Sequence, residues 1–169
     1  MNVRLDKSFY LKPATTLAIA LLGKLICRKQ NDCIQKYRIT ETECYFGMQD
    51  TACHASKGKT ARTKIMFEEG GVAYVYLCYG IHYMLNIVSG KAEHPEAVLI
   101  RGIEEANGPG KLTKLLNIDK TFNGENLCES QRFWLEDDFF KPKYITTKRI
   151  GISYATQEFQ DKPWRFLVK

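Results

Sequence analysis

The first apolar stretch of the chain has the pattern of one face of a helix. Leu17, Leu21 and Leu22 recur at helical spacing, and the Pro-Ala-Thr-Thr sequence before them contains typical helix-capping residues. We predict a helix here that ends near Gly23. The whole uncharged stretch, residues 13–23, is shorter than the roughly 20 residues that cross a bilayer, so we expect no transmembrane helix.

Two strand-like runs follow at residues 24–28 and 34–43, and a short polar segment that separates them predicts a turn. These runs indicate an antiparallel pair. Because side chains alternate along a strand, Glu41, Glu43 and Tyr45 are predicted to share one face of the second strand. Two negatively charged side chains on one face of a strand repel each other, so their presence there calls for a structural or functional explanation.

Aromatic and β-branched residues dominate two more runs, residues 71–78 and 81–89, which meet at Tyr79-Gly80. Glycine permits a tight turn, so these runs predict a hairpin with Tyr79 at or beside its tip. Residues 124–138 are acidic and turn-rich. Further predicted elements are a strand at 96–104, a short helix at 111–118, and strands at 148–154 and 164–168.

These elements predict a single α+β domain that covers residues 1–169. Strands alternate with a few flanking helices, which favours a curved, largely antiparallel sheet. A chain of 169 residues with 44% hydrophobic residues has material for one packed core, which excludes disorder of the whole chain. One site or one interface is therefore expected to account for the function.

The charge of the chain favours a polyanionic partner. Lys and Arg number 25 against 19 Asp and Glu, which gives a net charge of +6, and the isoelectric point is near 9.0. Residues 54–64 and 141–149 are basic segments without an acidic residue. Nucleic acid is the first partner to test, and the alternative is a solvated surface that only keeps the protein soluble.

The six cysteines form no C-x-x-C pair and share no metal-ligand spacing, which favours reduced thiols in a cytosolic protein. Cys53 beside His54, and Cys78 near His82, are better interpreted as buried small side chains or polar site groups than as zinc ligands. We therefore expect no metal. No signal-peptide cleavage site follows the first apolar stretch, and we expect no export signal.

Several short motifs occur in a distinctive order. They are residues 40–45 (TETECY), His54, residues 74–80 (YVYLCYG) with Asn86, residues 97–101 (AVLIR) and residues 107–112 (NGPGKL). Together they resemble the alkyladenine (3-methyladenine) DNA glycosylase family, in its short bacterial form, over residues 17–168. The resemblance implies a base excision repair enzyme with a protruding β-hairpin. Such an enzyme flips 3-methyladenine, 7-methylguanine or hypoxanthine out of duplex DNA and hydrolyses the N-glycosidic bond, leaving an abasic site.

The resemblance also implies roles for residues near the reacting bond. Glu43 matches the glutamate that activates a water and stabilises the positive charge that develops on the sugar. Arg101 matches an arginine that positions this water and a DNA phosphate. The Ile150 carbonyl matches a backbone acceptor for the same water.

Four aromatic or amide side chains match residues that handle the extruded base. Tyr45, His54 and Tyr76 match the stacking residues of the pocket, where cationic alkylpurines gain from electron-rich rings. Asn86 matches an asparagine that excludes the exocyclic amino group of guanine. Tyr79 matches the side chain that fills the hole in the base stack.

Arg62 and Lys64 are candidate phosphate contacts in the first basic segment. The family usually shows Thr-Pro-Arg-Asn where residues 60–63 are Thr-Ala-Arg-Thr, so this loop departs from the family pattern. No lysine or N-terminal proline lies beside Glu43 in the motif, which predicts a monofunctional enzyme without a Schiff base. No cofactor or metal is expected. We expect a monomer in a bacterial cytoplasm, or in a nucleus if the source is eukaryotic.

Each of these residues also has a plainer interpretation. Glu43 alone is an ordinary exposed strand glutamate, and Glu41 competes with it for the catalytic role. Arg101 could form a strand-edge ion pair with Glu104 or Glu105. Tyrosines of a sheet commonly pack in the core, and we prefer this interpretation for Tyr74. The alternative for Asn86 is a buried, hydrogen-bonded strand asparagine. The alternative for Tyr79 is a hairpin aromatic that caps the core.

Two other functions remain open at this point. The first is a noncatalytic domain that binds damaged DNA with an intact pocket. The second is an accessory domain that binds structured RNA, because a curved α+β sheet also resembles the tRNA-binding tail domain of formyltransferases. A basic structural protein would leave the order of the motifs unexplained.

Overall fold

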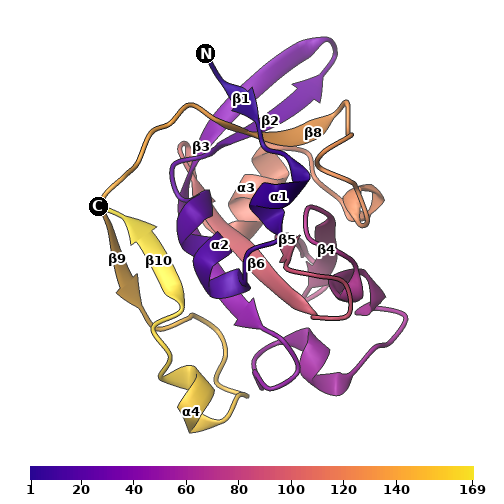
Figure 1. Ribbon diagram of the computed structural model, residues 1–169, viewed down its shortest axis with the longest axis vertical. Coiled ribbons are helices and arrows are strands. Elements are labelled where there is room, and N and C mark those ends of the chain that lie inside the picture. Colours follow the sequence, from indigo (N-terminus) through magenta and orange to yellow (C-terminus); the bar gives the residue numbers. More distant parts are fainter.

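The computed structural model describes residues 1–169 and contains one sheet in which every strand pair is antiparallel (Figure 1). The strands are β1 (Val3–Arg4), β2 (Leu25–Gln30), β3 (Cys33–Phe46), β4 (Ala73–Cys78), β5 (His82–Ser89), β6 (Glu96–Ile103), β7 (Ala106–Asn107), β8 (Phe133–Asp137), β9 (Tyr144–Thr147) and β10 (Arg165–Val168). Their order is β1-β8-β2-β3-β6-β5-β4, with β7 on β6, β10 on β3 and β9 on β10. The predicted α+β class is confirmed.

Short helices surround this sheet. The α-helices are α1 (Lys7–Tyr10), α2 (Ala14–Leu21), α3 (Pro109–Leu115) and α4 (Gln157–Gln160), and the 3₁₀ helices are η1 (His54–Lys57), η2 (Lys64–Phe67) and η3 (Lys120–Phe122). None of the helices has the length and apolar character needed to cross a membrane.

One face of the sheet packs against α2 and α3, and this packing forms the main core. Leu17 and Leu21 of α2 and Leu112 of α3 belong to the same buried cluster as Ile87 of β5 and Ile100 of β6. In Figure 1, α2 lies in front of the strands that it covers. Since this face is closed by helices, the opposite face of β3, β4, β5 and β6 is left for a site.

A break in strand register decides which β3 side chains reach that opposite face. Ile39 points into the main core. Thr42 is also fully buried on that side, and its hydroxyl donates to the Ala18 carbonyl of α2 at 2.8 Å. Regular alternation would not place residues 39 and 42 on one face. The β3–β6 pairing shifts register on both sides of Glu41, and such bulges re-aim side chains. The shift turns Glu41 and Glu43 away from the helices.

The two predicted hairpins are present. Asn31 and Asp32, both with positive φ, form the turn between β2 and β3. Strands β4 and β5 pair from Ala73 to Cys78, and their loop begins at Tyr79, with φ of 51°. The Tyr79 side chain is 90% exposed, so the predicted position at the tip is confirmed.

Three local predictions need correction. Residues 148–154 form no strand, because the Arg149 side chain is drawn into the interior and Gly151 has a φ of +73°. The strand lies just before them, at β9. The acidic, turn-rich segment contains β8, which pairs with β1 and β2. Helix α3 begins at Pro109, earlier than predicted, because proline fits the first turn of a helix.

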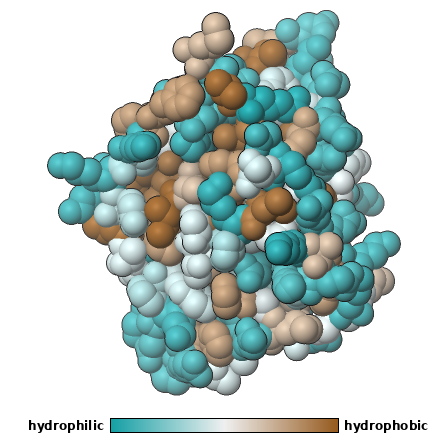
Figure 2. Space-filling model, in the orientation of Figure 1, coloured by the Kyte–Doolittle hydropathy of each residue, from teal (hydrophilic) through white to brown (hydrophobic).

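The surface on the side of α2 is mixed in character. Figure 2 shows hydrophilic residues around much of the outline and hydrophobic patches between them. A groove on the molecule is lined by residues of α2, of α1 and of the segment before β9, among them Ile19, Leu22, Phe140 and Tyr144.

The packing of β6 predicts a large effect of truncation on stability. Ile100 has no exposed surface, and we expect Ile100→Ala to lower the free energy of unfolding by about 2–5 kcal/mol because it leaves a cavity. Ile34→Ala is the matched control, since Ile34 is 48% exposed on β3 and its loss should cost about 0.5 kcal/mol or less. Urea denaturation of both variants measures the difference. Equal losses would contradict this account of the core.

Candidate active site

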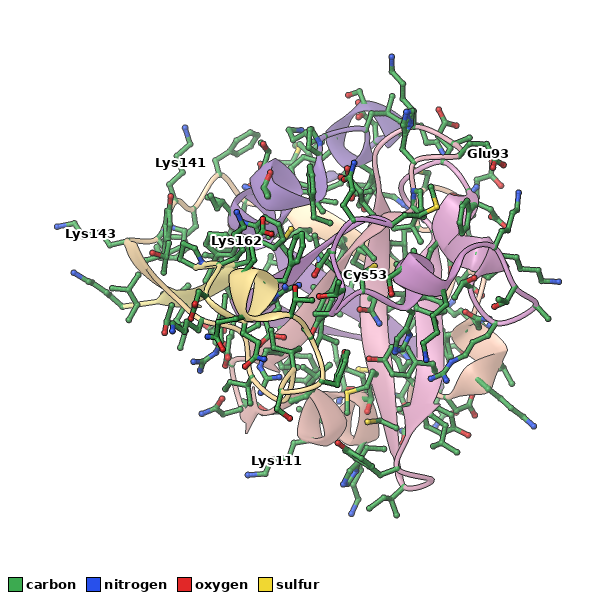
Figure 3. The ribbon with its side chains drawn as sticks, turned by 90° about the horizontal axis from the view of Figure 1, so that it is seen from below. Cys53, Glu93, Lys111, Lys141, Lys143 and Lys162 are labelled. Carbon is green, nitrogen blue, oxygen red and sulfur yellow. The ribbon has the colours of Figure 1, made fainter.

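Two adjoining cavities lie on the face of the sheet that the helices leave open. The inner pocket has a volume of about 310 Å³ and is lined mainly by aromatic and apolar residues: Tyr45, Ala52, Cys53, His54, Met66, Tyr74, Tyr76, Asn86, Ala97 and Tyr154. The outer cleft, of about 990 Å³, shares four of these residues and adds Arg62, Tyr79, Arg101 and Ile150 among others. The structure therefore brings all four predicted pocket residues together. Figure 3 shows Cys53 of the pocket wall near the centre of the view, with Lys141 and Lys143 toward its left edge.

The floor of the inner pocket is a second, smaller hydrophobic core. Met66 and Phe67 of η2 pack with Val88 and Ala97 in a buried cluster against which Tyr45 and Tyr76 lie. This packing holds the pocket aromatics in place, because well-packed interiors resist small displacements. Part of the pocket is therefore built by segments that the motifs do not include.

His54 and Tyr74 form the polar part of the pocket wall. The His54 Nδ1 lies 3.0 Å from the Tyr74 hydroxyl, and the His54 ring meets Tyr76 edge to face at 4.6 Å between centroids. Burial, together with the charges of Arg62 and Lys57, lowers the pKa of His54 to about 4. The imidazole is therefore neutral at pH 7. Tyr74 is buried as expected, but it also lines the pocket.

Asn86 is fixed by the neighbouring strand. Its Nδ2 donates to the Tyr74 carbonyl at 3.2 Å, and the residue is only 4% exposed. The side chain is thus both a buried, hydrogen-bonded strand asparagine and a pocket residue. Its orientation is set by backbone, which suits a group that selects by steric exclusion.

Glu43 lies directly behind the wall of the outer cleft. Its side chain has no exposed surface, and its Oε1 accepts from the Ile150 N–H at 2.8 Å while its Oε2 accepts from the Tyr45 hydroxyl at 2.9 Å. The Arg101 Nε is 3.5 Å from Oε1. Burial raises the pKa of Glu43 above its ordinary value, although Arg101, Ile150 and Tyr45 each oppose the rise. The plain interpretation of Glu43 as an exposed glutamate is wrong.

Arg101 is held by carboxylates on β3 rather than by Glu104 or Glu105. Its Nε donates to the Glu41 Oε1 at 3.1 Å. The same oxygen accepts from Arg165 of β10, a residue that the sequence did not single out. Arg165 and Glu43 are direct cross-strand partners, but that register has no local signal in the sequence.

A buried ion pair places the loop that contains Ile150. The Arg149 guanidinium makes two hydrogen bonds to Asp50, at 2.6 and 2.9 Å, and neither side chain has exposed surface. Arg149 also donates to the Cys44 carbonyl, and its guanidinium carbon lies 4.9 Å from the centre of the Tyr45 ring. Since Ile150 is next in sequence, this pair sets the contact with Glu43. The sequence did not predict either residue of the pair.

The loop at residues 60–63 is ordered by its two threonines. The Thr60 N–H donates to Thr63 Oγ1 at 2.8 Å, and Thr63 Oγ1 donates to the Gly58 carbonyl. These bonds structure the segment where the chain departs from the family pattern. Arg62 is exposed and its guanidinium carbon lies 5.2 Å from the centre of the Tyr76 ring, and Lys64 is also exposed.

No group of three or more His, Cys, Asp or Glu side chains is arranged to hold a metal ion. All six cysteines are free. The polar groups of the site are therefore the carboxylates, arginines, tyrosines, histidine and asparagine described above.

A buried carboxylate with a perturbed pKa beside an aromatic pocket is a candidate functional group. Comparison with known proteins identifies the class, because the profile of the methylpurine-DNA glycosylase family matches residues 8–106 and 104–169. The chain belongs to this family, and it is a DNA glycosylase, a hydrolase of N-glycosyl bonds in DNA repair. The predicted family resemblance is confirmed.

The chain is similar to curated bacterial proteins over nearly its full length. A protein of Borrelia garinii subsp. bavariensis is 45% identical over 98% of this chain and 96% of its own. A protein of Wolbachia pipientis wMel is 45% identical over 98% of this chain and 91% of its own. A protein of Borreliella burgdorferi strain B31 is 44% identical over 98% of this chain and 96% of its own. All three are named "Putative 3-methyladenine DNA glycosylase".

The raised pKa of Glu43 predicts a site that costs stability. Ionised Glu43 is disfavoured in the folded state, so its ionisation destabilises the protein fully above the folded pKa and not at all below the unfolded pKa of about 4.5. We expect Glu43→Gln to raise the melting temperature at pH 8. The gain should shrink as the pH falls toward 4.5, where the wild-type carboxyl is neutral. Thermal denaturation of both proteins from pH 4.5 to 8 measures this difference in melting temperature. A difference that is constant with pH, or that has the opposite sign, would contradict a raised pKa for Glu43.

Proposed function

We propose that the protein releases 3-methyladenine, 7-methylguanine and hypoxanthine from duplex DNA and leaves an intact abasic site. The observation that carries this proposal is the buried Glu43. Its hydrogen-bond partners Tyr45 and Ile150 and its ion-pair neighbour Arg101 all line the outer cleft. Because the inner pocket opens beside this cleft, a purine in the pocket would have its sugar next to these residues. The names of the bacterial relatives support the same substrate class.

In the proposed reaction, a water attacks C1′ of the sugar as the bond from C1′ to the purine N9 breaks. The bonding electrons leave with the base, and the water proton passes to Glu43. Methylated purines are cationic in DNA and leave as neutral bases, whereas hypoxanthine must take up a proton to do so. A carboxylate with a raised pKa is a stronger base at neutral pH and also stabilises the positive sugar.

Water reaches Glu43 only if one of its covering groups moves, because the carboxylate itself has no exposed surface. The Ile150 segment and the Arg101 side chain are the two covers that come from outside β3. We propose that the Ile150 carbonyl accepts a hydrogen bond from the attacking water and that Arg101 holds it and a DNA phosphate.

The inner pocket is suited to select damaged bases in two ways. Tyr45, His54 and Tyr76 offer ring surfaces, and stacking contributes about 1–3 kcal/mol per base. The fixed Asn86 amide would clash with the amino group of normal guanine. His54, neutral at pH 7, adds no positive charge to repel a cationic purine.

The surroundings of the pocket fit duplex DNA. Tyr79, exposed at the hairpin tip, would enter the space that an extruded nucleotide leaves. The exposed Arg62 and Lys64 and the basic segments would contact phosphates, with affinity that falls as salt rises. We propose that one chain acts alone, without a metal or cofactor, in a cytoplasm such as that of the bacterial relatives.

The role of Glu43 predicts loss of base release without loss of lesion binding. We expect Glu43→Gln to slow single-turnover release at least about 100-fold, because general base catalysis contributes about 10²–10⁴-fold. The assay uses duplex DNA with a single hypoxanthine and duplex DNA methylated with dimethyl sulfate, with EDTA present and abasic sites cleaved by alkali. Glu96→Gln is the control, since Glu96 is a partly buried carboxylate that accepts a backbone N–H at the start of α2.

Each other outcome of this assay has a clear meaning. Equal release by the wild type and by Glu43→Gln would exclude Glu43 as the base. Lesion binding without release by the wild type would favour a noncatalytic damaged-DNA domain, and preference for structured RNA would favour an RNA-binding domain. Trapping of the protein on DNA by borohydride would overturn the monofunctional mechanism.

The position of Tyr79 predicts an effect confined to duplex substrates. We expect Tyr79→Ala to reduce release of hypoxanthine from duplex DNA about 10-fold or more, because the hole in the stack stays unfilled. Release from a single strand should change little, since no stack is opened. Ile81→Ala is the control, because Ile81 is 71% exposed in the same turn. Equal losses on both substrates would show that Tyr79 does not fill the stack.

A further inference from the structure

Arg101 has two carboxylates within reach and donates its Nε hydrogen to Glu41 rather than to Glu43, the proposed base. The Nε lies 3.1 Å from the Glu41 Oε1 and makes a hydrogen bond to it, whereas the Glu43 Oε1 is 3.5 Å away and receives none from Arg101. The single Nε hydrogen can make one well-aligned hydrogen bond, so it cannot serve both carboxylates equally. Glu41 therefore takes a hydrogen bond that Glu43 would otherwise receive.

Arg165 holds Glu41 from the other side of β3. Its Nε lies 2.5 Å from the same Glu41 Oε1 that accepts from Arg101. Strand β10 pairs with β3 while β6 pairs with β3 on the opposite edge, so the two arginines approach Glu41 from opposite sides. Both are largely buried, with side-chain exposures of 15% for Arg101 and 19% for Arg165.

The glycine opposite Glu41 leaves room for this arrangement. Gly102 is the β6 partner of Glu41 at the register shift, and a Cβ atom there would lie 3.1 Å from the Glu41 Cβ and 3.5 Å from its Oε2. A larger residue at 102 would crowd the Glu41 Cβ and the Thr40 hydroxyl, which lies 3.0 Å from that Cβ position. The register shift and the glycine together position Glu41 between the two arginines.

Among the charged groups near Glu43, Arg101 and its partners Glu41 and Arg165 are the ones whose hydrogen bonding can change without disturbing the Arg149–Asp50 pair. Glu43 is faced by Tyr45 of β3, Arg101 of β6, and Arg149 and Tyr154 of the loop between β9 and α4. Glu41 adjoins it through the shared Arg101, and Arg165 is its cross-strand partner on β10. The charge of Arg149 is balanced by its two hydrogen bonds to Asp50. No comparable partner fixes Arg101 apart from Glu41 and Glu43.

We propose that Glu41 and Arg165 are positioning residues for the glycosylase reaction, which hold Arg101 beside Glu43 without letting it donate its Nε hydrogen to that carboxylate. This inference rests on the proposed role of Glu43 as the base. Arg101 stays close enough to hold a water or a phosphate, and Glu43 keeps the capacity to accept a proton. Neither positioning residue touches the substrate.

The proposal predicts opposite shifts for two substitutions. Glu41→Gln removes a negative charge near Glu43 and frees Arg101 to bond to Glu43, so proton binding by Glu43 weakens and the acidic limb of the rate profile moves to lower pH. Arg165→Gln removes a positive charge and leaves Glu41 uncompensated, so the limb moves to higher pH. We expect each shift to be about one pH unit, at the lower end of the effect of a nearby charge. Arg165→Lys should restore the wild-type profile in large part.

The experiment measures single-turnover release of methylpurines from dimethyl sulfate-treated duplex DNA from pH 4.5 to 9. Asp138→Asn is the matched control. Asp138 has a side-chain exposure of 22% and binds Arg38 of strand β3, and neither residue lines the inner pocket or the outer cleft. It should leave the limb in place. Melting temperatures check that each variant is folded, and if Glu41→Gln does not fold, the direction of the Arg165→Gln shift alone decides.

The outcomes separate this inference from the proposed function. Opposite shifts of the limb support the positioning role. Lower rates at every pH with an unmoved limb, or two shifts in one direction, overturn it, because a purely structural role gives no such sign change. If Glu43→Gln is as active as the wild type, the proposed function itself fails. If Glu43→Gln is inactive while Glu41→Gln and Arg165→Gln keep the wild-type limb, only the positioning role fails.

Discussion

The carboxylate of Glu43 is completely buried, and its burial governs the construction of the surrounding structure. A buried charge is costly unless it is paired and hydrogen-bonded, and here the partners come from three segments: Tyr45 on the same strand, Arg101 on β6, and the Ile150 N–H in the loop after β9. Burial still outweighs these contacts, since the pKa of Glu43 is raised. Burying this carboxylate therefore costs stability in its ionised form.

The contact from Ile150 depends on a second buried charge pair. Arg149 and Asp50 have no exposed surface, and breaking such a pair by removing one partner leaves an uncompensated charge in the interior. This pair ties the loop after β9 to the segment after β3 and supports the Tyr45 ring from behind. The contacts of Arg149 with Asp50 and of Arg101 with Glu43 thus connect distant parts of the chain around the Glu43 carboxylate.

The two faces of the sheet have different roles. One face carries α2, α3 and the main core, and the other carries the pocket, whose floor is a separate hydrophobic cluster with η2. The register shift at Glu41 connects the two, because it moves β3 from placing Ile39 in the core to placing Glu43 in the site. The orientation of Glu43 toward the candidate site therefore rests on a local irregularity in an otherwise regular sheet.

The sequence by itself determined the local features: the α2 helix, both hairpins, the Tyr79 tip, and the shared face of Glu41, Glu43 and Tyr45. These follow from spacing and turn chemistry between near neighbours. Tertiary structure alone decided that residues 148–154 are a loop and that Arg149 and Arg165 join the site, because their partners Asp50 and Glu41 lie 99 and 124 residues away. Contacts over such separations depend on strand register and burial, which no local pattern encodes.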